Sequence, residues 1–341
     1  MAVLSYIEAL NQAFREEMRR DESVVMWGED LISMNGVFGH TRDIYDEFGG
    51  DRIKDTPICE QAITGMAIGA AYRGLRPIGL FLNAGFMLPA FDGLFLKIGC
   101  RTTHLPIVMY GVIAGPREDP DHGMSPEALF AHAPYWKIVM PSTPYDVKGL
   151  VKSAIRDDGP VLVLDHAAAM YSGYSDGTLY TPYTDGTIMP GGNRQEVPDE
   201  EYLVPLGQAD IKREGTDITL VTYSFQVHHA LAAANALQKE DISVEVVDLR
   251  TIVPLDVATI VKSLSKTRRL LIVHEAMKRA GFAGEIAFRV LEEAPEVVTS
   301  LKTPIRRLAG KNLPLAMRLD WNLTPNSESI AAAVREMVKA T

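Results

Sequence analysis

Cysteine and positive charge are both scarce in this sequence of 341 residues. It has two cysteines, Cys59 and Cys100, which are too few for a disulfide framework and fit a reducing, cytoplasmic setting. Cys59 is expected to be a small buried thiol rather than a nucleophile. The formal net charge of −10 argues against a surface that binds nucleic acid or an anionic membrane.

Long hydrophobic runs are missing as well. The longest stretch without a charged residue, Pro77 to Phe91, contains two prolines and is too short to span a membrane. We expect no signal peptide, because the chain passes directly into the capping-box pattern Ser5-Tyr-Ile-Glu8 and an amphipathic helix. Hydrophobic residues make up 47% of the chain, so we expect a globular protein with room for two domains.

Short apolar segments alternate with helical patterns along most of the chain. This rhythm of strand, helix and strand predicts an α/β protein with parallel, doubly wound sheets. Residues 171–203 break the rhythm, since they are rich in Gly, Pro, Tyr, Asp and Ser without a clear period. We therefore expect two doubly wound domains, residues 1–180 and 204–341, joined by a linker over residues 181–203. The expected strands include Val24–Trp27, Arg76–Leu82, Leu105–Met109, Lys137–Met140, Val161–Leu164, Asp217–Tyr223 and Ser243–Asp248.

The most informative stretch runs from Asp55 to Gly74. It begins as a polar turn, Asp-Thr-Pro-Ile-Cys-Glu, and continues as an apolar helix of small residues, with Glu60 at the junction. A carboxylate at a helix start is favoured by the helix dipole, so Glu60 can be read as a helix cap. It can equally be read as a group that points into a site. The glycines and alanines that follow indicate that something approaches this helix closely.

This stretch resembles the beta subunit of the thiamine-diphosphate-dependent 2-oxo acid dehydrogenases, the family of the pyruvate, branched-chain and acetoin enzymes. In that family the glutamate hydrogen-bonds the aminopyrimidine ring of the cofactor and promotes loss of the thiazolium proton. The chemistry needs a carboxylate in a mostly apolar pocket. The resemblance implies that Glu60 is catalytic. It also implies a transketolase-like pyrimidine-binding domain followed by a transketolase C-terminal domain, which Asp248-Leu-Arg-Thr-Ile-Val-Pro-Leu-Asp256 matches.

Three further motifs carry the resemblance along the first domain. Gly28-Glu-Asp30 follows the first strand, and the resemblance implies that Glu29 lies near Glu60 in an acidic chain between two active sites. His122, in Asp-His-Gly-Met-Ser-Pro-Glu, takes the position of the family's active-site histidine, which serves the substrate carboxylate or the lipoyl group. Asn83 and Phe86 fall on the wall that faces the cofactor, where the family usually has other residues.

The motif that binds Mg²⁺ and the diphosphate in such enzymes is absent, since the chain has no Gly-Asp-Gly. The resemblance therefore implies an alpha subunit that supplies this half of the site, in an α2β2 assembly, and a lipoyl acyltransferase as a further partner. In several family members a helix-to-strand turn also binds potassium through backbone carbonyls and an aspartate. The matching residues here are Ile107, Ala154, Ile155, Asp157 and Gly159.

Three functions stay open at this point. We favour a beta subunit that decarboxylates a 2-oxo acid and passes the acyl group to a lipoyl carrier. The second is a two-chain thiamine enzyme of transketolase or acyloin type with another acceptor, which the unusual residues Leu80, Asn83, Gly85 and Tyr110 keep open. The third is a non-catalytic chain that only stabilises an alpha subunit, although retention of Glu60 and His122 speaks against it.

Overall fold

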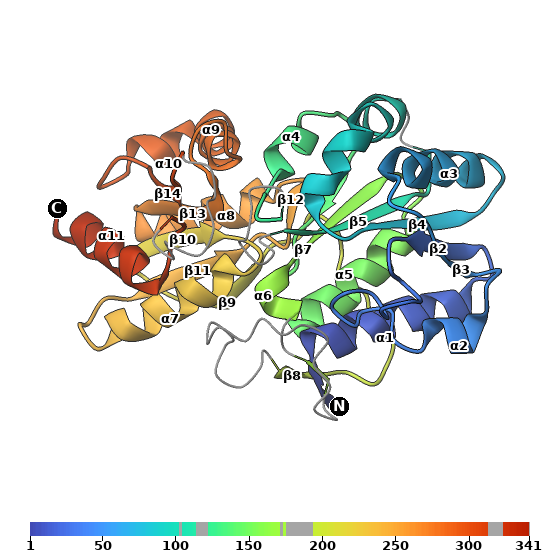
Figure 1. Cartoon of the computed structure of the whole chain (residues 1–341). Helices are drawn as coiled ribbons and strands as arrows, with labels where there is room; N and C mark the ends of the chain where they lie inside the picture. The colour runs from blue at the N-terminus through green and yellow to red at the C-terminus, as the bar shows by residue number, and fades with distance from the viewer. Residues whose placement is uncertain (102–103, 114–121, 171–172, 175–193, 313–322, 341) are drawn as a thin grey trace. The chain divides into compact units, whose positions relative to one another are not determined.

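The computed structural model describes residues 1–101, 104–113, 122–170, 173–174, 194–312 and 323–340. It divides into two compact units, Met1–Leu206 and Gly207–Thr341, each of which is described by itself (Figure 1). The expectation of an α/β protein with doubly wound sheets is confirmed in both units.

A parallel sheet forms the centre of the first unit. Its strands follow the order β6-β7-β5-β4-β2-β3, and every neighbouring pair is parallel. β2, β5 and β7 are buried along their whole length, which is why they read as continuous apolar runs in the sequence. The bounds are β2 (Val24–Gly28), β3 (Ile53–Asp55), β4 (Arg76–Phe81), β5 (Val108–Ile113), β6 (Lys137–Val139) and β7 (Val161–His166).

Helices cover both faces of this sheet. α1 (Tyr6–Arg20) and α5 (Pro144–Arg156) pack together on one face, and α3 (Glu60–Tyr72) lies on the other with η1 (Ala84–Ala90) and η2 (Asp92–Gly99) (Figure 1). The predicted capping box is confirmed, because the Ser5 side chain accepts from Glu8 N–H and the Glu8 carboxylate accepts from Ser5 N–H. The remaining elements are β1 (Ala2–Ser5), antiparallel to β8 (Arg194–Val197), and the short helices α2 (Ile44–Phe48), α4 (Glu127–Ala131) and α6 (Ala167–Met170).

Two expectations about this unit are wrong. The strand expected at Leu105–Met109 begins at Val108 and continues to Ile113, because Pro106 has no N–H and the Ile107 N–H is used by the Leu105 carbonyl. Tyr110 therefore lies inside the strand instead of after it. Cys59 is exposed rather than buried, since it precedes α3 in the turn at the edge of the sheet.

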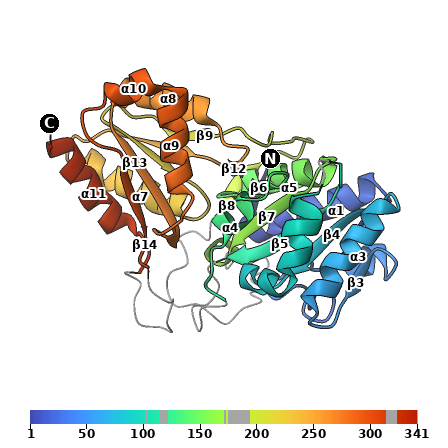
Figure 2. The ribbon, with the colours of Figure 1, turned by 90° about the horizontal axis from the view of Figure 1, so that it is seen from above.

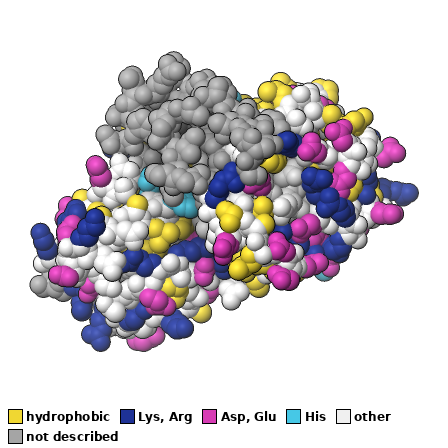
Figure 3. All heavy atoms as spheres, turned by 90° about the horizontal axis from the view of Figure 1, so that it is seen from below, with side chains coloured by type: hydrophobic (Ala, Val, Ile, Leu, Met, Phe, Trp, Pro, Cys, Tyr) yellow, Lys and Arg dark blue, Asp and Glu magenta, His cyan; other side chains and the backbone are white. Residues whose placement is uncertain are grey.

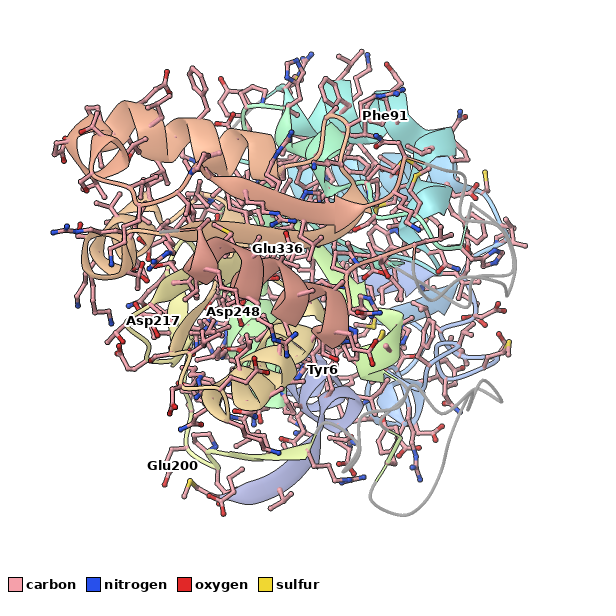
Figure 4. The ribbon with its side chains drawn as sticks, turned by 90° about the vertical axis from the view of Figure 1, so that its left-hand side faces the viewer. Tyr6, Phe91, Glu200, Asp217, Asp248 and Glu336 are labelled. Carbon is pink, nitrogen blue, oxygen red and sulfur yellow. The ribbon has the colours of Figure 1, made fainter. Side chains whose placement is uncertain are left out.

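A buried carboxylate joins α1 to the sheet. Tyr6 of α1 (labelled in Figure 4) donates to Asp165 Oδ1 at 2.6 Å, and Tyr110 of β5 donates to Oδ2 at 2.7 Å. Burial raises the pKa of the Asp165 carboxyl to about 6, and the two hydroxyl groups partly oppose this rise. The Tyr110 side chain is thus a hydrogen-bonded part of the buried core.

The second unit is a smaller doubly wound sheet in the order β14-β13-β10-β11-β9, with only the edge strand β9 antiparallel. Leu271 and Val273 of β13 pack on α7 and α11, and α8 and α9 cover the opposite face (Figure 1). The elements are β9 (Asp210–Arg213), β10 (Ile218–Thr222), α7 (Gln226–Gln238), β11 (Val244–Asp248), β12 (Thr251–Val253), α8 (Val257–Thr267), β13 (Leu270–Met277), α9 (Ala283–Glu293), α10 (Pro295–Thr299), β14 (Arg306–Gly310) and α11 (Ser327–Lys339).

The surface is mixed in charge. Basic and acidic side chains are interspersed over the described part of the face in Figure 3, which is the usual pattern of a solvated surface. Among the residues that the structure describes, none of the helices has both the length and the apolar character needed to cross a membrane.

Candidate functional site

The carboxyl ends of β2 and β4 meet at one edge of the first sheet, and the predicted acidic residue lies there. Glu29 directly follows β2, and Asn83 follows β4 by two residues. A methyl group on Gly28 would lie 2.2 Å from the Leu80 carbonyl oxygen, so glycine is required for the two strand ends to approach this closely. Polar groups at this edge of a parallel sheet are placed where α/β proteins bind their ligands.

Glu29 is an unusual carboxylate. Its side chain is buried, and Oε1 has no hydrogen-bond partner among the described residues. The pKa of its carboxyl is raised from 4.5 to about 7, first by burial and then by the negative charge of Glu60. The charge of Asp30 adds to this rise, and the backbone amide of Leu82 opposes it. Glu29 is therefore poised to hold or release a proton near neutral pH.

Glu60 opens α3 and lies close enough to Glu29 for its charge to raise the pKa of the Glu29 carboxyl. Its side chain is half-buried and forms no hydrogen bond within the described part of the chain, and the residue before it, Cys59, makes no side-chain cap. The helix-cap reading of Glu60 thus gains no support from a hydrogen bond. The Trp27 indole N–H, which donates to the Ile63 carbonyl at 3.1 Å, ties the first turn of α3 to β2. This bond holds the first turn of α3, which carries Glu60, close to the strand that precedes Glu29.

The structure also brings Phe86 and His122 together. The edge of one ring meets the face of the other at a centroid distance of 5.1 Å and an interplanar angle of 80°. Phe86 lies on η1, and His122 is half-buried just after residues 114–121, which fall outside the described residues. The four predicted residues form two pairs, Glu29 with Glu60 and Phe86 with His122.

Several buried polar atoms near this edge have no partner in the described residues. Besides Glu29 Oε1, these are Asn83 Oδ1 and the hydroxyls of Thr56 and Thr64. Asn83 is 2% exposed and precedes η1 without capping it, and Thr64 lies one turn after Glu60 on α3. Buried polar groups are normally hydrogen-bonded, so this concentration fits a site whose partner atoms come from a bound group. An aminopyrimidine ring offers such donors and acceptors.

The residues expected to hold potassium are engaged by protein cations. The Lys137 ammonium contacts both Asp157 carboxylate oxygens, at 2.7 and 2.5 Å, and Arg76 donates to the carbonyls of Ile155 and Asp157 at 3.1 and 2.9 Å. The Ile107 and Ala154 carbonyls accept from Val161 and Asp157 N–H groups, while Gly159 N–H donates to the Asp157 carboxylate. This turn therefore does not fit a potassium ion without displacement of these side chains.

Sequence reasoning assigned no role to one residue that shapes this edge. Asp55, at the end of β3, accepts from the N–H groups of Ile32 and Ser33 at 2.7 and 3.0 Å. It thereby braces the loop that follows Glu29. The sequence did mark Asp55, because this residue opens the motif that contains Glu60. Only the pairing of β2 with β3 shows that Asp55 meets the loop after Glu29.

Comparisons with known proteins agree with this architecture. The model of the transketolase pyrimidine binding domain matches residues 2–171, and that of the transketolase C-terminal domain matches residues 207–330. A structure described as a split gene transketolase, inactive beta4 tetramer, has a TM-score of 0.77 at 20% identity and covers 99% of both chains. A transketolase from Leishmania mexicana has a TM-score of 0.66 at 14% identity, over 99% of this chain and 46% of that one. At these identities the two structures show the fold alone.

The sequence relatives are closer. The chain is 41% identical to the 2-oxoisovalerate dehydrogenase subunit beta of Bacillus subtilis, over 99% of this chain and 100% of that protein. It is 40% identical to the pyruvate dehydrogenase E1 component subunit beta of the same organism, with the same coverage. The pyrimidine-binding domain implies thiamine diphosphate, and a beta subunit implies an alpha partner. With such similarity over its whole length, the chain belongs to the beta subunits of the first component of the thiamine-diphosphate-dependent 2-oxo acid dehydrogenases.

Proposed function

We propose that this chain, together with an alpha subunit, decarboxylates a 2-oxo acid and passes the acyl group to a lipoyl carrier. The observation that carries the proposal is the pair of neighbouring carboxylates, Glu29 and Glu60, at an edge lined by unpartnered polar atoms. When bound, thiamine diphosphate supplies the carbanion chemistry that decarboxylation of a 2-oxo acid requires. The family supplies only the substrate class, a 2-oxo acid. The two relatives are named for different 2-oxo acids and are almost equally similar to this chain, so they do not identify the particular acid.

Each residue of the pair has a separate task in this proposal. Glu60 hydrogen-bonds the ring nitrogen of the aminopyrimidine and exchanges a proton with it. Glu29, whose pKa is about 7, keeps a proton close to Glu60 at neutral pH and replaces the one that is transferred. Asn83 supplies a free carbonyl oxygen beside the ring, and Phe86 forms an apolar wall. Exclusion of water by this wall strengthens the hydrogen bond to Glu60.

His122 serves the later step. Its ring is held edge-on to Phe86 and remains half-buried, so one end stays within reach of an incoming group. An imidazole can hold or move a proton at the substrate carboxylate or at the sulfur of the lipoyl group. We assign His122 to acyl transfer and not to activation of the cofactor.

The alpha subunit binds the open face of α3, and we propose an α2β2 assembly. This face consists of Ala62, Gly65, Met66, Gly69 and Tyr72, all exposed, and Figure 2 views the first unit from the side that carries α3. Methyl groups added to Gly65 or Gly69 would meet nothing within 4 Å. The close approach that the small residues predict is therefore made by another chain. Because this chain lacks Gly-Asp-Gly, that partner also supplies the Mg²⁺-diphosphate half of the site.

Potassium does not enter the proposal. The Lys137 ammonium and the Arg76 guanidinium meet the carboxylate and carbonyl oxygens that the family's ion would bind, and we propose that they hold the turn between α5 and β7 in its place. A fixed ammonium offers the same charge as K⁺ at a similar distance.

Two of the four unusual residues no longer support the alternative enzyme with another acceptor. Tyr110 is committed to Asp165, and Leu80 is 1% exposed within β4, so both belong to the core. Only Asn83 and Gly85 remain near the site edge. The acyloin-type alternative is then tested by the acceptor: the complex should transfer the acyl group to a lipoylated carrier at a higher rate than to an aldehyde.

The direct test is Glu60→Gln in the complex with the alpha subunit. It should leave assembly intact and slow hydrogen-deuterium exchange at the thiazolium carbon by ~10²–10⁴-fold, the usual worth of a general acid-base group. The matched control is Asp92→Asn, which removes an exposed carboxylate from the start of η2 and should change nothing. Exchange at the wild-type rate in Glu60→Gln would reject the catalytic role and favour a chain that only stabilises its partner. A panel of 2-oxo acids then identifies the substrate.

A further inference from the structure

The second unit contains an arginine without a counter-charge. Arg307 of β14 pairs in register with Ile272 of β13. Since Leu271 and Val273 pack on α7 and α11, Ile272 and Arg307 point to the opposite face, under α8 and α9. Arg307 is half-buried and forms no ion pair or hydrogen bond with any residue that the structure describes. Such a cation is normally paired when it is removed from water.

The neighbouring Arg306, on the same strand, is an arginine that does have a carboxylate partner. Arg306 points to the other face and donates to Glu336 of α11, labelled in Figure 4, at 2.5 Å. The two residues share a strand and a charge, and they differ only in the face they occupy and in the presence of a carboxylate. Arg306 is thus a natural control for Arg307.

The N-terminus of α9 lies directly above Arg307. A Cβ on Gly284, in the first turn of this eleven-residue helix, would be 3.5 Å from Arg307 Nη1. No side chain caps the helix, because Phe282 occupies the N-cap position. A guanidinium beside the positive end of a helix dipole is electrostatically unfavourable. The exposed Glu285 of the same turn forms no ion pair with Arg307, so the positive potential at this point is not neutralised.

A fully buried histidine completes the cluster. His274 of β13 points to the same face as Arg307, and its ring lies against the turn before α9, where a Cβ on Gly281 would be 2.6 Å from Cε1. His274 is 0% exposed, yet neither ring nitrogen has a hydrogen-bond partner in the described part of the chain. Burial and the Arg307 charge lower its pKa to about 4, and the nearby Ala276 backbone opposes this fall. The ring is therefore neutral and can donate one hydrogen bond.

The position in the fold is also that of a ligand site. The chain leaves β10 for β11 on one side and later returns to β13 on the other, so the topological switch point lies between β10 and β13. Ligands of open α/β sheets bind in the crevice at the carboxyl ends of the strands at this point. Ser224 follows β10 there with φ of 55°, and its buried hydroxyl also has no partner among the described residues. Figure 2 shows α9 beside β13, and the two elements are in contact.

We propose that the carboxyl end of β13, beneath the N-terminus of α9, binds a small anion with a phosphoryl group, held by Arg307 of β14, the N-terminus of α9 and His274. A guanidinium and helix amides are common phosphate ligands, and a tetrahedral group can face several donors at once. The bound group neutralises the guanidinium and the helix end and accepts from the neutral imidazole. This site is independent of the decarboxylation site and lies entirely within the second unit.

The test is thermal unfolding of the full chain in inorganic phosphate at constant ionic strength, with chloride as the balancing anion. The wild-type Tm should rise saturably, by roughly 5 °C once phosphate exceeds its Kd tenfold. Arg307→Gln should weaken the apparent affinity about 10- to 100-fold, as expected for loss of a charged hydrogen bond. Arg306→Gln should lower the starting Tm without changing the phosphate response. The diphosphate half of the cofactor site is absent from this chain and contributes nothing to the signal.

A second variant keeps the test decisive if Arg307→Gln does not fold. Gly284→Asp places a carboxylate within reach of Arg307 at the helix start, so it should raise the Tm in chloride and abolish the phosphate response. A flat wild-type titration would overturn the site. So would a phosphate response that survives Gly284→Asp, or one that is lost equally in Arg306→Gln. Acetate that stabilises the wild type as well as phosphate does would overturn the phosphoryl assignment.

Discussion

Replacement of Glu29 by glutamine should remove a large pH dependence from the stability of the chain. The pKa of this carboxyl rises from 4.5 to about 7 on folding, which corresponds to about 3 kcal/mol. Because the folded chain holds this proton more tightly, unfolding releases it between these two pH values, and the free energy of unfolding falls as pH rises through that window. The loss is complete above pH 7. Glu29→Gln cannot ionise, so it should avoid this loss.

The assay is thermal unfolding of wild type and Glu29→Gln at pH 5 and pH 8 and equal ionic strength. Near pH 5 the two proteins should melt at similar temperatures, whereas at pH 8 the variant should melt roughly 6–12 °C higher, at ~2–4 °C for each kcal/mol. Taking the difference between the proteins cancels the titrating groups that do not interact with Glu29. Equal pH slopes in the two proteins would refute the buried, proton-holding state of Glu29.

Glu60→Gln separates the two causes of the raised pKa. Burial is the larger cause, and the Glu60 charge is the second. Removal of that charge alone should therefore reduce the pH dependence without abolishing it. A pH dependence that is unchanged in Glu60→Gln would mean that the two carboxylates do not lie close together.

Three further predictions concern other parts of the first unit. His122→Ala should exchange the thiazolium proton normally in the complex yet pass the acyl group slowly to a lipoylated carrier; normal transfer would make His122 a bystander. The Tm should be the same in KCl and NaCl, because the Lys137 ammonium already contacts Asp157, and a rise specific to KCl would show that the ion displaces it. Tyr6→Phe should lower the free energy of unfolding by ~1.5–3 kcal/mol at pH 7, measured with urea, and by less at pH 5, where Asp165, with a pKa of about 6, is protonated. Equal losses at the two pH values would contradict an ionised Asp165.

Local rules predicted most of the framework. The capping signal at Ser5 is present as hydrogen bonds, because it depends only on residues within one turn. The buried strands were recognisable since parallel strands covered on both faces are apolar throughout. Glu60 was recognisable for a different reason, namely that the polar turn and the small-residue helix around it form a specific motif.

Contacts between segments that are distant along the chain could not be predicted from the sequence. β1 pairs with β8, from Ala2 opposite Val197 to Ser5 opposite Arg194, and β8 lies inside a stretch that composition alone marks as a linker. The burial of Glu29 depends on how closely β2 approaches β4, and the ammonium group that contacts Asp157 belongs to Lys137, outside the motif. Tyr110 looked like a change at the site and is instead a core residue, because strand register decides which way a side chain points.

The open face of α3, which we propose that the alpha subunit covers, sets a condition on the amounts in which the two subunits are made. A surplus of this chain leaves Met66 and Tyr72 in water, together with Ile58, which is 82% exposed just before the helix. Apolar surface of this kind attracts chaperones and further copies of the same chain. Matched synthesis of the two subunits is then a requirement imposed by one helix, and any excess of this chain faces aggregation or turnover.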